Sequence, residues 1–161
     1  MNFAGRVGLV TGRNGGICLA MAAPPADAGA IVGRNREKNA AVAATSAREG
    51  APTPMAFAGH MTDEQSVAET IQGVVDCFGA LDILFNNAGA NDRKVPQDYS
   101  VAEWNRLIPS NLTSAFIVSQ AAYPLVVARG GGKIVNIGSL MSVFGPPKSA
   151  RYAAAKRGVV N

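Results

Sequence analysis

Residues 7–17 read Val-Gly-Leu-Val-Thr-Gly-Arg-Asn-Gly-Gly-Ile, and this stretch decides the fold class. Its first four residues are valine, glycine or leucine, as in a short strand that is buried on both faces. The glycines that follow allow a sharp backbone turn, and we expect residues 19–22 to continue as a helix. A strand, a glycine-rich turn and a helix in this order can hold a pyrophosphate, because the N–H groups at the helix N-terminus are free to bind its oxygens.

The remainder of the chain alternates short apolar runs with longer helical stretches. Residues 83–85 and 134–137 are apolar or nearly so, and we predict that they form neighbouring central strands. Pro52 and Pro54 flank the third strand and confine it to a sheet edge, because proline cannot donate a backbone hydrogen bond. The pattern predicts one α/β domain over residues 1–161, with a three-layer, Rossmann-type, doubly wound parallel sheet of about five strands in the order 3-2-1-4-5.

Two capping boxes mark the starts of helices. Thr62 and Gln65 precede a long run in which apolar residues recur at helical spacing. Ser100 and Glu103 form the second box, at the start of the next helix.

Composition argues against several classes of function. The 161 residues carry a net charge of +4, but the charged residues are spread along the chain, which argues against a nucleic-acid partner. No unbroken apolar run approaches the roughly 18 residues of a membrane span, and the N-terminus lacks the order of a signal peptide. We therefore expect a cytoplasmic protein with no membrane and no nucleic-acid partner.

The cysteine and histidine residues argue against two further kinds of site. Cys18 and Cys77 form no Cys-x-x-Cys pair, and His60 is the only histidine, so we expect free buried thiols and no metal site. A serine hydrolase is also disfavoured, because Ser139 stands in Gly-Ser-Leu rather than in a Gly-x-Ser-x-Gly elbow.

Three later motifs point to chemistry beside the glycine-rich turn. Residues 86–89 read Asn-Asn-Ala-Gly directly after an apolar run, where side-chain amides can hold the backbone beside a ligand. Tyr152 and Lys156 are four residues apart and share one face of a helix, and they follow Ser139 and Asn111. In this order and at this spacing, the motifs resemble the short-chain dehydrogenase/reductase family over the whole chain.

This resemblance implies a nicotinamide-dependent oxidoreductase. Tyr152 would be the general acid/base and Lys156 would assist it, because a tyrosine phenol ordinarily titrates at about pH 10. Ser139 would hydrogen-bond the reacting oxygen, and Asn111 would anchor a water that links Lys156 to solvent. Hydride would pass between the nicotinamide ring and the carbonyl or hydroxyl carbon of the substrate. The implied cofactor contacts are Gly12, Arg13, Asn14, Gly16, Ile17, Arg34, Asn87, Ala88, Gly89, Tyr152 and Lys156.

Two geometric expectations follow from the resemblance. The turn over residues 12–16 and Asn87 should meet between the first and fourth strands, at the switch point of the sheet. The hydroxyl groups of Ser139 and Tyr152 should face each other if the last segment is helical.

The end of the second strand bears on the choice of cofactor. A carboxylate there would accept hydrogen bonds from the ribose of NAD, whereas a basic residue would meet the 2′-phosphate of NADP. Residues 30–35 contain no acid, and Arg34 stands about where the family has its phosphate-selecting arginine. We therefore expect NADP, with NAD as the alternative.

Several positions depart from the family pattern. Cys18 replaces the last glycine of the turn, and His60 replaces an aspartate that contacts the adenine edge, so that His60 is expected on the surface. Pro24 and Pro25 should break the first helix near Ala23.

The length of the chain also departs from the family. The family needs roughly 250 residues, so we expect that the last strands, the substrate loop and part of the usual homo-oligomer interface are missing. Two classes of function stay open: an NADP-dependent oxidoreductase, and an inactive nucleotide-binding fragment or degenerate paralogue. We expect the isolated chain to be inactive and to retain at most weak affinity for NADP.

The sequence offers a lead to the small-molecule substrate. Residues 91–96 and 135–145 are similar to gluconate and deoxygluconate dehydrogenases of the family. This similarity favours a sugar acid or polyol, with Arg93 and Lys94 facing its carboxylate. Solvated loop charges at these two positions, and a simple keto acid or alcohol as substrate, stay open.

Overall fold

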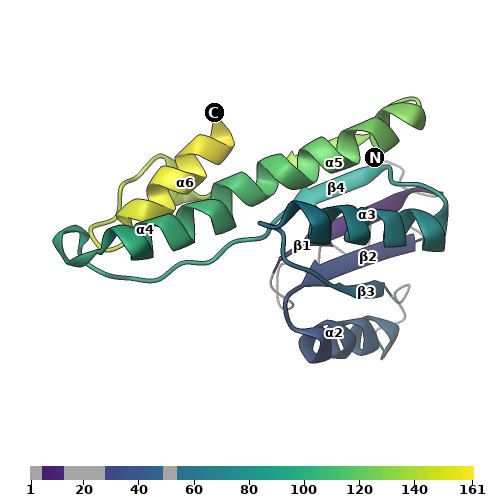
Figure 1. Ribbon diagram of the computed structural model, residues 1–161, viewed down its shortest axis with the longest axis horizontal. Helices are drawn as coiled ribbons and strands as arrows, with labels where there is room; N and C mark the ends of the chain where they lie inside the picture. The colour runs from purple at the N-terminus through teal and green to yellow at the C-terminus, as the bar shows by residue number, and fades with distance from the viewer. Residues whose placement is uncertain (1–4, 13–27, 49–53) are drawn as a thin grey trace.

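The computed structural model describes residues 5–12, 28–48 and 54–161. Within these residues the strands form one sheet (Figure 1). The strands are β1 (Val7–Thr11), β2 (Ala28–Gly33), β3 (Met55–Ala58), β4 (Ile83–Asn86) and β5 (Lys133–Asn136). Their order is β3-β2-β1-β4-β5 and every neighbouring pair is parallel, which confirms the predicted doubly wound sheet.

β1 is the central strand, and all of its residues are buried. Leu9 of β1 lies opposite Ala30 of β2 on one side and Leu84 of β4 on the other. Of the described strands, β3 pairs only with β2, at the edge that the flanking prolines predict. β4 and β5 are neighbours as expected, although β5 is the opposite edge of the sheet within the described residues rather than a central strand.

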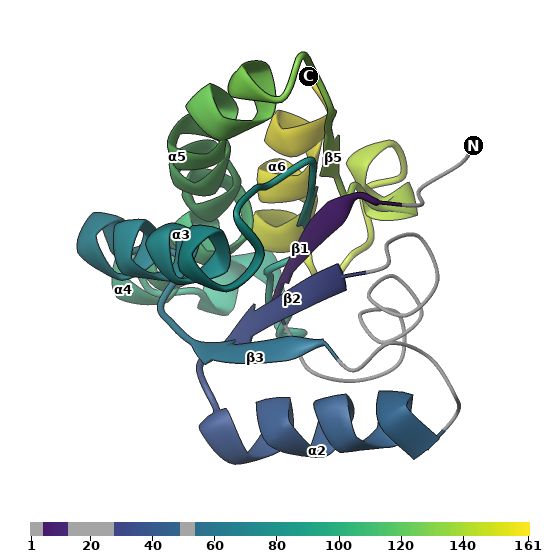
Figure 2. The ribbon, with the colours of Figure 1, turned by 90° about the vertical axis from the view of Figure 1, so that its right-hand side faces the viewer.

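Helices cover both faces of this sheet. Those of the described residues are α2 (Arg36–Arg48), α3 (Glu64–Phe78), α4 (Val101–Ile108), α5 (Ser114–Ala128) and α6 (Ala150–Val160). A π-helical turn, η2 (Pro109–Thr113), joins α4 to α5. α3 and α5 pack against each other and against the sheet, whereas α2 lies on the other side, against β2 and β3 (Figure 2).

Alternate residues of the strands supply two apolar cores, one on each face. Leu9 belongs to the larger cluster, together with Val118 of α5. Its neighbour Val10 belongs to the second cluster, together with Val42 of α2. Because successive side chains of a strand point to opposite faces, a central strand covered on both faces must be apolar throughout.

The structure confirms one predicted capping box and corrects the other. The hydroxyl of Ser100 accepts from the N–H of Glu103 at 3.1 Å, and the Glu103 carboxylate accepts from the N–H of Ser100 at 2.8 Å. At α3 the cap is Asp63 rather than Thr62, and its carboxylate accepts from the N–H of Ser66 at 2.7 Å. Aspartate is well suited to this position because its charge also complements the positive end of the helix.

The continuous helical stretch Val101–Ala128 is long and apolar enough, by length and composition alone, to cross a membrane. This is weak evidence for a span, because the core helix of a folded domain meets the same criterion. Here the α5 part of the stretch packs against α3, β4 and β5, and it belongs to the layer that covers the sheet.

Asp82 joins the amino-terminal ends of the central strands. It is fully buried and accepts hydrogen bonds from the N–H of Val7 at 2.9 Å, from Arg6 at 2.9 Å and from Arg129 at 3.2 Å. Its own carbonyl accepts from the N–H of Lys133 in β5 at 3.0 Å. Burial raises the pKa of the Asp82 carboxyl, but the hydrogen bonds from Val7, Arg6 and Arg129 outweigh burial and hold the pKa below its ordinary value of 3.8.

Replacing Asp82 by asparagine should lower the free energy of unfolding by about 2 kcal/mol at neutral pH. The loss is smaller than that from breaking a fully buried ion pair, because both arginines are half-exposed. The folded-state pKa lies below the unfolded one, so the stabilisation is complete above the unfolded pKa and is lost as pH falls through the folded-state pKa. In urea unfolding, the difference between wild type and Asp82→Asn should therefore shrink on acidification. Asp76→Asn, on the exposed surface of α3, is the control, and equal losses in both variants would contradict the role of Asp82.

Candidate functional site

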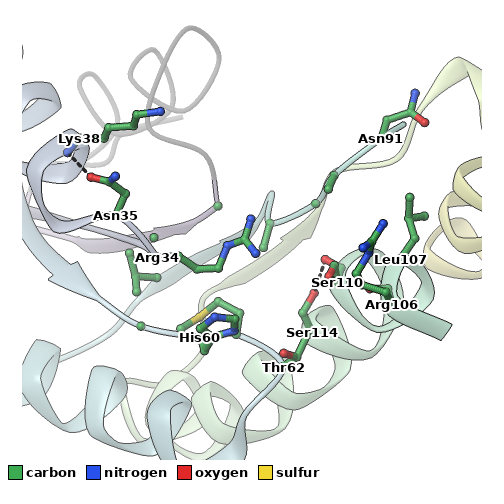
Figure 3. Close-up of a pocket in the computed structure, with 18 of the residues that line it drawn as sticks. Arg34, Asn35, Lys38, His60, Thr62, Asn91, Arg106, Leu107, Ser110 and Ser114 are labelled. Carbon is green, nitrogen blue, oxygen red and sulfur yellow. Dashed lines mark hydrogen bonds between the residues drawn. The ribbon is translucent and has the colours of Figure 1, made fainter. Parts of the chain in front are cut away.

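A cleft of about 660 Å³ opens at the carboxyl ends of the strands. Gly12 comes after β1, Arg34 after β2, His60 after β3 and Gly89 after β4, and all four line the cleft. Figure 3 shows Arg34 and His60 on the side of the sheet and a helical wall over residues 106–114 across from them. In an open α/β sheet, this crevice is where ligands bind.

Thr11 fastens the loop after β4 to the end of β1. Its hydroxyl accepts hydrogen bonds from the N–H groups of Asn87 at 3.2 Å and Ala88 at 3.1 Å. The side-chain amide of Asn87 donates to the Thr11 carbonyl at 3.1 Å. The predicted meeting of the glycine-rich turn with Asn87 between β1 and β4 is therefore confirmed as far as Gly12, where the description of the turn ends.

Gly12 and Gly89 stand where no side chain would fit. Gly12 has a φ of 117°, and a Cβ atom there would lie 2.7 Å from the Cα of Ala88. At Gly89 a Cβ atom would lie 2.5 Å from the Oδ1 of Asn111. Glycine at these two positions therefore allows the neighbouring segments to pack closely at the floor of the cleft, with no side chain projecting from it.

Asn111 is buried on the π-helical turn and holds the loop after β4 in place. Its Nδ2 donates to the carbonyls of Ala90 and Leu107, both at 2.9 Å, and its Oδ1 accepts from the N–H of Ala90 at 3.2 Å. Single π-helical turns are frequent at functional sites. The structure thus shows Asn111 as a backbone clamp, and its role in anchoring a water stays a prediction.

α6 presents Tyr152 and Lys156 one turn apart. Lys156 is buried, and its Nζ donates to the carbonyl of Ile137 at 2.6 Å and lies 5.9 Å from the centre of the Tyr152 ring. Burial lowers the pKa of the Lys156 ammonium group below its ordinary value of 10.5. A Cβ atom on Gly89 would lie 3.8 Å from the same Nζ, so Lys156 and Asn111 meet at the loop after β4.

Ser139 precedes the short 3₁₀ helix η3 (Leu140–Ser142), which packs against α6. The Ser139 hydroxyl oxygen accepts from the N–H of Met141 at 3.1 Å, an interaction that does not use the hydroxyl proton. Ser139 can therefore keep its position while it donates to a reacting oxygen. Tyr152 is half-buried on α6, and the facing of its hydroxyl towards Ser139 stays a prediction.

The cleft is rich in positive charge. Arg34, Lys38 and Arg106 line it, and Asp92 is the one carboxylate among the described residues of the lining. Asp92 is already paired, with Arg151 and, at 3.9 Å, with Arg106. Lys38 was not predicted, but its position four residues after Arg34, in the first turn of α2, is the signal that could have revealed it.

The helical wall of the cleft was not predicted either. Arg106, Ser110 and Ser114 are spaced four residues apart, which places them on one face of a helix. The hydroxyl of Ser114 donates to the carbonyl of Ser110 at 3.0 Å. The sequence signal for this wall is the four-residue spacing, which begins in the capped helix and continues past Asn111.

Several predicted features lie outside the described residues. They are the cofactor contacts Arg13, Asn14, Gly16 and Ile17, the substituted position Cys18 and the helix break at Pro24 and Pro25.

The predictions for cysteine and histidine have mixed outcomes. Cys77 is a free thiol but is exposed rather than buried, because it falls between the positions Val74 and Phe78 that face the sheet. His60 is exposed, as predicted. Among the residues that the structure describes, no group of three His, Cys, Asp or Glu side chains could hold a metal ion.

Lys94 already has a partner for its charge. Its Nζ lies 2.9 Å from both carboxylate oxygens of Glu103. The N–H of Ser100 and the ammonium group of Lys94 lower the pKa of Glu103 to about 2. Of the two basic residues predicted to face a substrate carboxylate, Lys94 is therefore engaged in a surface ion pair, while Arg93 is exposed.

Comparison with known proteins places these features in context. The model of the short chain dehydrogenase family matches residues 6–161. The chain is 34% identical over 161 residues to the 3-oxoacyl-(acyl-carrier-protein) reductase of Escherichia coli (strain K12), with 99% of this chain and 65% of that protein covered. It is 35% identical over 163 residues to the gluconate 5-dehydrogenase of Gluconobacter oxydans (strain 621H), with 99% and 63% covered. The chain thus spans about 65% of the length of such relatives.

Solved structures show the same similarity. An NAD⁺-bound xylitol dehydrogenase superimposes with a TM-score of 0.91 at 35% identity, over 99% of this chain and 63% of its own. A metagenomic short-chain oxidoreductase in complex with NADP superimposes with a TM-score of 0.88 at 29% identity, over 98% of this chain and 73% of its own. Proteins similar to this chain therefore bind NAD⁺ in one case and NADP in the other.

Replacing Gly12 by alanine should lower the free energy of unfolding by about 3 kcal/mol, because a positive φ and an overlap with the backbone of Ala88 act together. Gly79 provides the matched control, since its φ is 73° and a Cβ atom there would meet nothing within 4 Å. Gly79→Ala should therefore show the backbone effect alone, about 1 kcal/mol. Urea unfolding of both variants is the measurement, and equal losses would contradict the close approach at Gly12.

Proposed function

The chain belongs to the short chain dehydrogenase family, and we propose that it transfers hydride between a nicotinamide cofactor and a carbonyl or hydroxyl substrate. The observation that carries this proposal is the meeting of Lys156, Asn111 and the loop after β4 beside the cleft at the strand ends. The cleft volume of about 660 Å³ lies within the range of small-molecule and cofactor sites. The alternative, nucleotide binding without chemistry, is separated from this proposal by the turnover experiment below.

The described residues fit a dinucleotide. Gly12 and Gly89 leave the floor of the cleft free of side chains, and Ala88 adds only a methyl group. Arg34 and Lys38 supply positive charge at its rim. These residues, with Asn87 and with Arg13, Asn14, Gly16 and Ile17 of the turn, would hold the cofactor, and the bound nicotinamide would supply or accept the hydride.

The residues on α6 and η3 support the proton chemistry. Tyr152 would give a proton to the substrate oxygen or take one from it, and the free hydroxyl proton of Ser139 would hydrogen-bond the same oxygen. Because burial lowers the pKa of Lys156, its ammonium group releases a proton more readily than a solvated lysine does. This property suits a residue that returns protons to Tyr152 after each turnover.

Among the nicotinamide cofactors we favour NADP, with NAD as the alternative. Arg34 and Lys38 are exposed, line the cleft and lie four residues apart in the sequence after β2. Two basic side chains at this place suit a phosphate better than a ribose hydroxyl, which would need a hydrogen-bond acceptor. The one carboxylate among the described residues of the lining, Asp92, is paired with Arg151.

For the substrate we favour a small sugar acid or polyol in the cytoplasm. Support comes from the similarity to gluconate 5-dehydrogenase and to xylitol dehydrogenase. Arg93 is the exposed cation on the loop after β4 that would suit a carboxylate, since Lys94 is paired with Glu103.

The choice of cofactor can be tested by fluorescence titration with NADPH and NADH. Arg34→Glu should weaken NADPH binding by about tenfold or more relative to NADH, because the new carboxylate repels the 2′-phosphate and accepts from the ribose. Arg36→Glu makes the same change of charge two residues further on, at an exposed position that does not line the cleft, and should leave the ratio unchanged. An unchanged ratio in Arg34→Glu would count against NADP.

The proposed chemistry can be tested with Tyr152→Phe. In assays with NADP or NAD and a series of sugar acids, polyols and simple carbonyl compounds, any turnover by the wild type should fall by about a hundredfold or more in this variant, because it has no proton to exchange. Tyr123→Phe, at an exposed site on α5, is the matched control and should keep full activity. Cofactor binding with no turnover in the wild type would favour a nucleotide-binding role alone.

A further inference from the structure

Arg151 is a buried arginine that the proposed chemistry does not use. Its side chain is 1% exposed and stands directly before Tyr152, in the first turn of α6. Its Nη2 pairs with the carboxylate of Asp92, and its guanidinium carbon lies 4.3 Å from the centre of the Tyr99 ring. Within the part of the chain that the structure describes, none of its three side-chain nitrogens has a hydrogen-bond partner, and Nη2 has the ion pair alone. A buried cation with unsatisfied N–H groups is unfavourable, so packing alone does not explain an arginine at this position.

The start of α6 lacks the contacts that usually stabilise a helix N-terminus. Ser149 is the N-cap residue, but its side chain makes no capping hydrogen bond, and the first turn contains no acidic residue. A helix end without these contacts tends to fray. Because Tyr152 lies in this first turn, fraying would displace the phenol that has to meet the substrate.

The loop after β4 instead holds the chain just before α6 and a side chain of its first turn. The N–H of Lys94 donates to the carbonyl of Lys148 at 3.0 Å, and the hydroxyl of Tyr99 donates to the same carbonyl at 3.4 Å. Asp92 of this loop lines the cleft and also pairs with Arg151 on α6. α4, which follows the loop, packs against α6 (Figure 1). The rim of the cleft and the first turn of α6 are therefore joined through this loop.

We propose that Arg151 is a positioning residue, which clamps the first turn of α6 to Asp92 and Tyr99 and so holds Tyr152 in place. The stacked guanidinium and the ion pair restrain the turn from the side, as a capping hydrogen bond would from the end. The carboxylate of Asp92 also places a negative charge near the positive end of the helix. This inference rests on the proposed function, because a fixed position of Tyr152 matters for proton exchange with the substrate.

Hydrogen exchange at Ala153 tests the clamp directly. The N–H of Ala153 donates to the carbonyl of Ser149 at 2.9 Å and closes the first turn of α6. Arg151→Met keeps an unbranched apolar stem and removes the charge, and it should accelerate exchange at Ala153 by about tenfold or more, with exchange in β1 and β4 unchanged. Arg157→Met is the matched control: it removes from the same helix a guanidinium that donates to the Ser142 carbonyl at 3.2 Å and takes no part in the contacts with Asp92 and Tyr99, and it should leave Ala153 unchanged.

Two further measurements identify the partner and the consequence for Tyr152. Asp92→Asn should accelerate exchange at Ala153 as Arg151→Met does, and the charge swap that combines Asp92→Arg with Arg151→Asp should restore part of the protection. With 3-fluorotyrosine incorporated, the Tyr152 fluorine resonance, identified by its loss in Tyr152→Phe, should move towards that of the free amino acid in Arg151→Met. The resonance of Tyr123, exposed on α5, should stay in place.

Unchanged exchange at Ala153 in Arg151→Met would overturn the proposal. So would an equal acceleration throughout β1 and β4, since that result would show a general contribution to stability rather than a local clamp. An unmoved Tyr152 resonance would overturn the positioning role even if the turn frays. None of these readouts needs cofactor or turnover, so a failure to bind NADPH would count against the proposed function alone.

Discussion

The close approach of two backbones, at Gly12 after β1 and Ala88 after β4, sets the geometry of the cleft. The hydroxyl of Thr11 fixes this approach by accepting hydrogen bonds from Asn87 and Ala88. A side chain at residue 12 would push the loop after β4 away from β1. Asn111 and Lys156 both reach this loop, so their positions depend on the contact between β1 and β4.

Polar side chains at both ends of the sheet act mainly on the backbone. At the carboxyl ends, Thr11, Asn111 and Lys156 each hydrogen-bond to backbone groups of another element. These bonds fix the relative positions of the segments that line the opening of the cleft. At the amino ends Asp82 does the same for β1, through the N–H of Val7, and for β5, through its carbonyl and Lys133. Between these ends the sheet is apolar on both faces, and apolar packing by itself would tolerate small shifts of one strand along another. The polar contacts remove that freedom.

The features that could be predicted from the sequence are those encoded within a few residues. The order of the strands follows from the alternation of elements, and the Ser100 and Glu103 capping box needs only two residues at fixed spacing. The start of α3 was misplaced by one residue because Thr62 and Asp63 are both good caps, and only the backbone decides between them. Arg34 was found because it follows a strand directly.

Features built from distant segments were not found from the sequence. Arg106, Ser110 and Ser114 face Arg34 across the cleft although more than 70 residues separate them along the chain. The partners of Arg151 are equally hidden, since nothing near it in the sequence indicates Asp92 or Tyr99.

Two neighbouring cations on α6 show how stability and function oppose each other in this fold. Burial lowers the folded-state pKa of Lys156 below its ordinary 10.5, so the unfolded chain binds a proton more tightly than the folded one. Its charge is therefore destabilising below the folded-state pKa, and stability rises with pH across the window up to 10.5. Arg151 adds to the same helix buried N–H groups that have no hydrogen-bond partner among the described residues. Buried charges are unfavourable unless they are fully paired and hydrogen-bonded, and residues that break a local rule in this way concentrate at functional sites. That both stand within one turn of Tyr152 is the strongest reason to seek the chemistry of this protein on α6.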